Sequence, residues 1–123
     1  MSSAAPNDTS ELILVVGNVR TWIAQGRELP QDSGFRYLDY ADMDAEALSD
    51  AAPSIVLSPL VANGFDALDV AARLYTLGFT GRYRVLSPKL PHPDMVLTEL
   101  RAQAPGIDCE LYQVTNPLKL RVV

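Results

Sequence analysis

The chain has 123 residues, of which 48% are hydrophobic and 20% are charged, as is typical of a globular protein. This length suits one domain that buries a core without help from metal ions or disulfides. The net charge of −5 disfavours binding to nucleic acid or anionic membranes, and no apolar run approaches the roughly 20 residues of a membrane span. Cys109 is the only cysteine, which excludes an internal disulfide and favours the cytoplasm. Since there is also only one histidine, we expect neither a zinc site nor a cofactor.

Strands and helices are expected to alternate along the chain. Residues 1–10 are small and polar and lack the features of a signal peptide, so we expect a disordered leader before a single domain at residues 11–123. Short apolar runs predict strands at residues 11–16, 35–40, 54–58, 82–87 and 107–114. Helical spacing and capping residues predict helices that begin near residues 19, 42, 66 and 93.

The third helix has the clearest boundaries. Asn63 or Asp66 can cap its start, and it runs to about Leu77, where Gly78 suits the left-handed position that ends a helix. Asn18 is a candidate cap for the first helix in the same way. The predicted inner face of the third helix consists of Phe65, Leu68, Ala71, Ala72 and Tyr75.

This alternation implies a parallel sheet with right-handed crossovers and helices on both faces. Five strands joined by four helices predict an α/β three-layer sandwich of the flavodoxin-like type, with strand order 2-1-3-4-5. The run at residues 11–16 is almost continuously apolar, which is typical of a strand buried on both faces. The run at residues 35–40 alternates and is expected nearer an edge of the sheet.

Small polar residues stand where four of the strands end. Ser58 and Ser87 close the third and fourth strands, each before a proline, while Asn18 and Asn116 follow the first and the fifth. Ligands of parallel α/β domains bind at this edge of the sheet. The four residues therefore form a candidate ligand-binding crevice, and their neutral groups suit an uncharged ligand better than a phosphate.

From Leu12 to about Leu118 the chain resembles the receiver domain of response regulators. The resemblance rests on residues 12–18, 53–58, 85–87 and 116–118 and on the helix that follows Gly64. Receivers carry an acidic pair after the first strand and a phosphoacceptor aspartate at the end of the third. They also carry a serine or threonine at the end of the fourth strand and a Lys-Pro pair after the fifth. The resemblance implies a receiver-like fold.

Most of the receiver's chemistry is missing at the matching positions. Gly17-Asn18 replaces the acidic pair, Ser58 replaces the phosphoacceptor and Asn116 replaces the lysine, so only Ser87 fits. Receivers use carboxylates to bind Mg²⁺, a carboxylate as the nucleophile and a lysine to balance the developing charge. A serine without a neighbouring base is a poor nucleophile near neutral pH. The resemblance therefore implies a degenerate pseudo-receiver that acts independently of receiver-type phosphorylation and is not an enzyme.

Several of these residues also have a purely structural interpretation. Ser58 and Ser87 can end their strands by satisfying a backbone group that the following proline cannot. His92 lies between two prolines with no serine or cysteine motif nearby, which favours a structural or exposed role. Cys109 lies in an alternating strand and is expected to be a small buried hydrophobe.

The end of the chain departs from the receiver pattern, in which a fifth helix follows Lys-Pro. Residues 118–123 alternate between apolar and basic as in a strand, so we expect the fifth helix to be absent or replaced by an extended tail. An apolar sheet face is then left for the tail or a second copy of the chain to cover. We expect a homodimer through the region from the fourth strand to the C-terminus, with interface residues Leu111, Leu118, Leu120 and Val122.

Three classes of function stay open. The first is a non-catalytic pseudo-receiver that binds and regulates a partner protein independently of phosphorylation. The second is a domain that binds a small molecule in the strand-end crevice. An enzyme is the most disfavoured, because no acid–base pair or nucleophile–base couple can be placed at the strand ends.

Overall fold

The computed structural model describes residues 12–29 and 34–114. Its elements are β1 (Ile13–Gly17), α2 (Val19–Ala24), β2 (Phe35–Asp39), the 3₁₀ turn η1 (Tyr40–Asp42), α3 (Ala45–Ala51), β3 (Ile55–Pro59), β4 (Val61–Ala62), β5 (Phe65–Asp66), α4 (Ala67–Thr76), β6 (Arg82–Pro88), α5 (Pro93–Gln103) and β7 (Asp108–Val114). The α/β class is confirmed, with a five-stranded parallel sheet and four α-helices in the described residues. The predicted leader and tail, and with them Asn116, Leu118, Leu120 and Val122, lie outside the described residues.

The parallel strands lie in the order β2-β1-β3-β6-β7. The numbers differ from the predicted order 2-1-3-4-5 because two further strands, β4 and β5, form a separate antiparallel hairpin after β3. The predicted fourth and fifth strands of the sheet are therefore β6 and β7. Asn63 and Gly64 make the turn of this hairpin, and Gly64 adopts a φ of +92°, which favours glycine. The hairpin escaped sequence analysis because strands of two residues are too short to show alternation.

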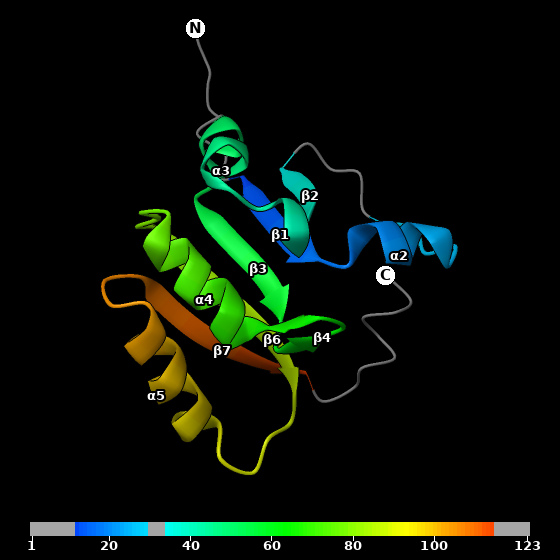
Figure 1. Cartoon of the computed structure of the whole chain (residues 1–123). Helices are drawn as coiled ribbons and strands as arrows, with labels where there is room; N and C mark the ends of the chain where they lie inside the picture. The colour runs from blue at the N-terminus through cyan, green and yellow to red at the C-terminus, as the bar shows by residue number, and fades with distance from the viewer. Residues whose placement is uncertain (1–11, 30–33, 115–123) are drawn as a thin grey trace, which may run out of the picture.

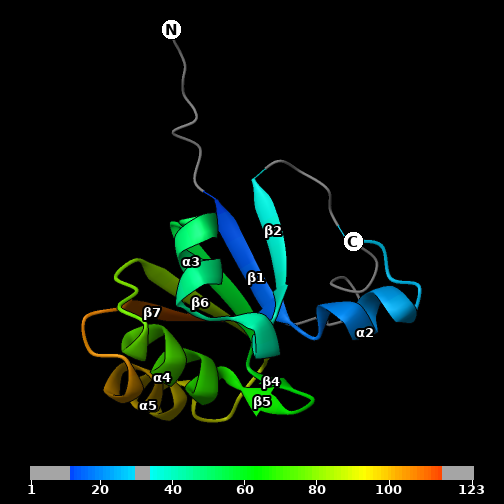
Figure 2. The same ribbon diagram turned by 45° about the horizontal axis from the view of Figure 1, so that its top comes forward.

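The helices cover the two faces of the sheet unequally. α3, α4 and α5 all lie on one face, called the covered face below (Figures 1 and 2). α2 projects beyond the carboxyl end of β1 and reaches the opposite face, called the second face below, only at a corner (Figures 1 and 2). There the indole ring of Trp22 packs so closely against Gly17 that no Cβ atom would fit.

The core lies between the covered face and its three helices. Alternate residues of the central strands point into it and are almost fully buried, namely Leu14, Val16, Val56, Tyr83 and Val85. α4 adds a buried stripe at helical spacing, formed by Ala67, Val70, Ala71 and Leu74.

The predicted inner face of the third helix, α4, is therefore wrong in part. Tyr75 points outward and is 53% exposed. Phe65 is buried as expected, but it belongs to β5 and not to the helix. A stripe counted from Phe65 at helical spacing is consequently rotated away from the face that α4, which begins at Ala67, turns to the sheet.

Local hydrogen bonds fix both ends of α4 as the sequence predicts. The Asp66 carboxylate accepts from the N–H of Asp69, and the Asp69 carboxylate accepts from the N–H of Asp66, each at 3.0 Å. At the other end Gly78 has a φ of +82° and its N–H donates to the carbonyl of Tyr75. These caps set the residues at which α4 begins and ends.

Replacing Gly17 with alanine tests the packing of α2 on the second face. The added methyl group would overlap ring atoms Cη2 and Cζ2 of Trp22, so the indole must move. We expect Gly17→Ala to lower the free energy of unfolding by about 1–3 kcal/mol and to shift the fluorescence of Trp22, the single tryptophan, to longer wavelength. Thr21→Ala, an exposed change on the same helix, is the control and should alter neither quantity. An unchanged emission spectrum in Gly17→Ala would contradict this packing.

Candidate functional site at the strand ends

Ser58 lies at the end of β3 on the covered face and is 1% exposed. Its Oγ shares a 2.6 Å hydrogen bond with the hydroxyl group of Tyr83 and donates to the Pro59 carbonyl at 3.1 Å. Since a serine hydroxyl has one proton, Tyr83 is the donor in the shared bond when Ser58 donates to Pro59. The Ser58 hydroxyl is thus occupied by internal partners and does not line an open crevice.

Tyr83 explains why a hydroxyl is needed at this strand end. It stands in β6 with 0% exposure and is the largest fully buried side chain of the described residues. Its hydroxyl lies 2.6 Å from Ser58 Oγ and 3.4 Å from the carbonyl oxygen of Ala67, at the start of α4. Burial raises the pKa of this hydroxyl well above its usual range, while the hydrogen bond to Ser58 acts in the opposite direction. Tyr83 therefore stays neutral and joins β3, β6 and α4.

The other strand-end residues do not complete a site with Ser58. Ser87 is 3% exposed, and its Oγ donates to the Pro88 carbonyl at 2.8 Å. Asn18 is half-buried and occupies the N-cap position of α2, but its side chain makes no capping hydrogen bond there. In the described part of the chain no hydrogen bond joins any of these three side chains to another, and Asn116 lies outside it.

An acidic pair that sequence analysis missed lies at the end of β2. Asp39 accepts from the backbone N–H of Arg20 at 3.2 Å and forms an ion pair with the Nε of Arg20 at 3.1 Å. The same guanidinium group binds Asp42. Both carboxylates thus bind one cation, which offsets one of their two negative charges. Residues 12–29 and 34–114 hold no group of three metal-ligating side chains. The pair had no sequence signal, because Arg20 is 19 residues away from Asp39.

Arg73 of α4 contacts η1, which in turn packs against the hairpin of β4 and β5. Its guanidinium lies 4.1 Å above the ring of Tyr40 and donates to the Tyr40 carbonyl at 2.9 Å. The Tyr40 ring stacks in turn on Phe65, with the centroids 4.6 Å apart. The side chains of Arg73, Tyr40 and Phe65 thus form a stacked cluster that joins α4, η1 and β5.

The remaining candidates of the sequence analysis have structural roles. Cys109 is 1% exposed, as predicted, and burial raises the pKa of its thiol, which disfavours the reactive thiolate. His92 is exposed and precedes α5 without capping it. Leu111 packs against the core on the covered face. None of the helices in the described ranges has the length and apolar character needed to cross a bilayer.

Neither protein-family models nor curated proteins show a match to this chain.

A double-mutant cycle tests the buried pair of hydroxyls. We expect Ser58→Ala to lower the free energy of unfolding by about 1–3 kcal/mol, because it leaves Tyr83 with only a long bond to Ala67. Tyr83→Phe should cost about 0.5–1.5 kcal/mol, and the double variant should lose clearly less than the sum. Urea denaturation measures all four proteins. Ser87→Ala is the control, because the Ser87 hydroxyl donates to Pro88 and not to Tyr83, and its loss of stability should simply add to that of Tyr83→Phe. If the losses of Ser58→Ala and Tyr83→Phe were also strictly additive, the hydrogen bond between the two hydroxyls would be contradicted.

The raised pKa of Tyr83 also predicts a dependence of stability on pH. The unfolded chain releases the tyrosine proton near its ordinary pKa of about 10, whereas the folded chain retains it. Tyr83 therefore supports the folded state below about pH 10 and loses this contribution as the pH rises further. The unfolding free energy should fall less steeply above about pH 10 in Tyr83→Phe than in the natural chain. Tyr75→Phe, at a 53% exposed tyrosine, should keep the natural slope, and equal slopes in all three would refute the prediction.

Proposed function

We propose that the protein is a non-catalytic pseudo-receiver, a phosphorylation-independent module that regulates a partner protein through direct contact. The observation that carries this proposal is the occupied hydroxyl of Ser58, which is 1% exposed and bonded to Tyr83 and Pro59. The residue at the receiver's phosphoacceptor position therefore serves the core. The parallel sheet order and the helices on its covered face support a receiver-like, flavodoxin-type scaffold.

The surroundings of Ser58 do not favour group transfer. A serine nucleophile needs a neighbouring base, and the only side chain that bonds to Ser58 in the described residues is the neutral Tyr83. Asp39 and Asp42, the nearest equivalent of a receiver's acidic set, are both bound to Arg20. These partners support the proposed non-catalytic role.

The binding of a small molecule at the strand ends receives less support. Two of its four residues, Ser58 and Ser87, are at most 3% exposed and donate to the carbonyl of the proline that follows each of them. A ligand would have to displace these bonds before it could replace them. A cytoplasmic protein partner is the proposal that fits the single buried cysteine and the acidic net charge.

Treatment with a small phosphodonor tests the proposal. We expect no added phosphoryl group after incubation with acetyl phosphate and Mg²⁺, measured as intact mass, and no Mg²⁺-dependent change in the fluorescence of Trp22. A competent receiver domain treated in parallel shows that the donor is active. Stoichiometric labelling that disappears in Ser58→Ala would refute the proposal and show that Ser58 leaves its bond with Tyr83 to react.

A further inference from the structure

An open groove lies on the covered face between α3 and the end of α4. One wall is the side of α3 that runs along residues 45–52, and the other is the chain at residues 77–81, where α4 ends and β6 is about to begin. Pro53 and Gly81, which come shortly before β3 and β6, also line it, so the groove lies at the opposite edge of the sheet from Ser58. Its volume of about 340 Å³ is near the lower end of the range for ligand sites.

Small side chains keep the groove open. Ala45, Ser49 and Ala52 stand at helical spacing on one side of α3, so they share the wall that faces α4. The opposite wall contains Gly78 and Gly81, which have no side chain to fill the space. The two helices are therefore separated here by a hollow that can hold a side chain from another molecule.

The part of the lining nearest the core is apolar. Leu48 is buried, whereas Leu77 and Phe79 are only partly buried and pack against the core from its margin. Ser49 and Thr80 add exposed hydroxyl groups to the lining. An apolar lining with a few polar groups is the usual composition of a binding site. A hollow of this size and lining suits one apolar side chain of a partner.

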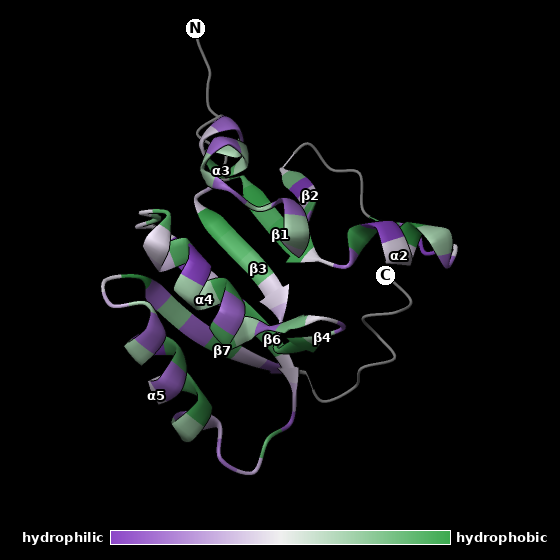
Figure 3. Cartoon of the chain, viewed as in Figure 1, coloured by the Kyte–Doolittle hydropathy of each residue, from purple (hydrophilic) through white to green (hydrophobic). Residues whose placement is uncertain are grey.

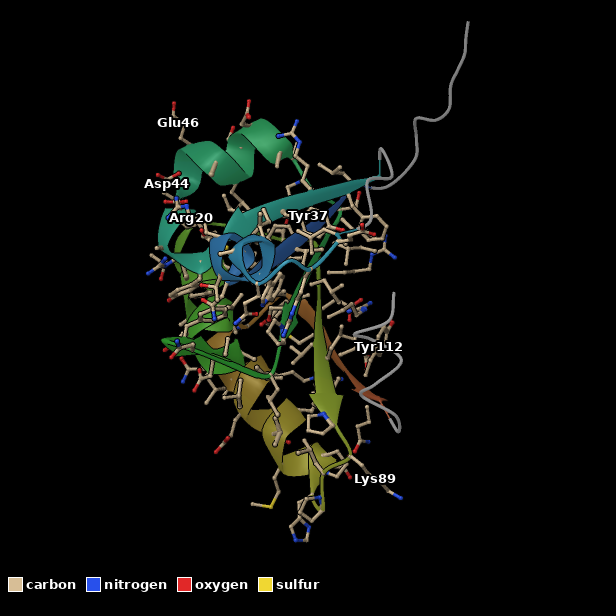
Figure 4. The ribbon with its side chains drawn as sticks, turned by 90° about the vertical axis from the view of Figure 1, so that its right-hand side faces the viewer. Arg20, Tyr37, Asp44, Glu46, Lys89 and Tyr112 are labelled. Carbon is tan, nitrogen blue, oxygen red and sulfur yellow. The ribbon has the colours of Figure 1, made fainter. Side chains whose placement is uncertain are left out.

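The wall formed by α3 is acidic. Asp44, Glu46 and Asp50 belong to this helix and its N-cap, which carry no basic residue. Figure 4 shows Asp44 and Glu46 projecting outward from the helix, and Figure 3 shows hydrophilic segments along it. None of the residues that line the groove itself carries a charged side chain. The groove thus has an uncharged interior beside a rim of carboxylates.

The arginines near the groove leave this rim with a net negative charge. Arg36 of β2 lies 3.5 Å from Asp50, in an ion pair whose side chains are 52% and 79% exposed. Arg73 of α4 is turned away and donates to backbone carbonyls at and after η1. Arg82 stands on the second face, because its neighbour Tyr83 points into the core. Three carboxylates are therefore offset by one guanidinium.

We propose that this groove is the docking site for the partner protein, and that the partner inserts an apolar side chain flanked by lysine or arginine. This inference rests on the proposed function, because it names the surface and the chemistry of that module's contact. The apolar side chain would contact Leu48, Leu77 and Phe79, while the flanking cations would face Glu46 and Asp50. The net charge of −5 also attracts a basic partner over a longer range.

Charge separates this partner from two other occupants. A second copy of the chain would bring a further net charge of −5 toward the acidic rim, and like charges that meet at an interface disfavour it. An anionic ligand would meet the same repulsion, with no cation in the lining to bind it. A basic segment with an apolar side chain satisfies both the interior and the rim.

Titration of the full chain with capped tetrapeptides, followed by the amide signals in NMR spectra, tests the proposal. The probes are acetyl-KLFK-amide, its acidic counterpart ELFE and its polar counterpart KGSK. We expect KLFK to shift the signals of Ser49, Gly78 and Thr80 with a dissociation constant on the order of 1 mM. ELFE and KGSK should each bind at least about fivefold more weakly, because one lacks the cations and the other lacks the apolar side chains.

Two variants test whether binding occurs in the groove. Ser49→Phe places a ring in the groove and should abolish the binding of KLFK. Thr76→Phe, which adds the same ring at an exposed residue of α4 outside the lining, is the matched control and should bind KLFK as the natural chain does. Circular dichroism confirms that both variants are folded.

Four outcomes would overturn the proposal. KLFK could cause no shift up to about 10 mM, well above the expected dissociation constant, or ELFE could bind equally well. Ser49→Phe could bind KLFK with the natural affinity. Phenethylammonium, tested as a free amine, could bind as tightly as KLFK, and the groove would then be a site for small organic cations. None of these results bears on labelling by the phosphodonor, so the proposed pseudo-receiver function stands or fails separately.

Discussion

The hydrogen bond between Ser58 and Tyr83 is the constraint on which the centre of the fold depends. A tyrosine with 0% exposure in a middle strand must place its hydroxyl against a polar partner, since an unpaired buried hydroxyl costs about 1–3 kcal/mol. Ser58 on β3 and the Ala67 carbonyl at the start of α4 provide the partners. These contacts therefore join β3, β6 and the start of α4.

The same bond bears on the pseudo-receiver that we propose. The phosphoacceptor of a receiver is a charged and accessible side chain, which an interior position beside a neutral tyrosine does not tolerate. An aspartate at position 58 would bury its carboxylate against Tyr83, whose pKa is already raised by burial. Ser58 suits the core for the reason that makes it unsuitable for phosphoryl transfer. In the pseudo-receiver that we propose, the packing of this one strand end accounts for the loss of phosphoryl transfer.

Sequence reasoning recovered the parts of the fold that depend on short-range patterns. Apolar runs located the five strands of the parallel sheet, although not the hairpin of β4 and β5. Asp66 and Gly78 located the ends of α4, because capping depends on residues within one turn. The burial of Ser58 was not predictable in this way, because its partner Tyr83 is 25 residues away and is brought there by strand pairing. The cluster of Arg73, Tyr40 and Phe65 was missed for the same reason. Short-range signals define elements, and sites arise where distant elements meet.

β1 is apolar on both of its faces, although its core side chains account for only one of them. Leu14 and Val16 are explained by the core beneath α3 and α4, but this core gives no reason for Ile13 and Val15 to be apolar. At the corresponding positions β6 carries Arg82 and Arg84, so charged residues can stand on the second face of this sheet. Ile13 and Val15 therefore give β1 the apolar sequence that is typical of a strand covered on both faces.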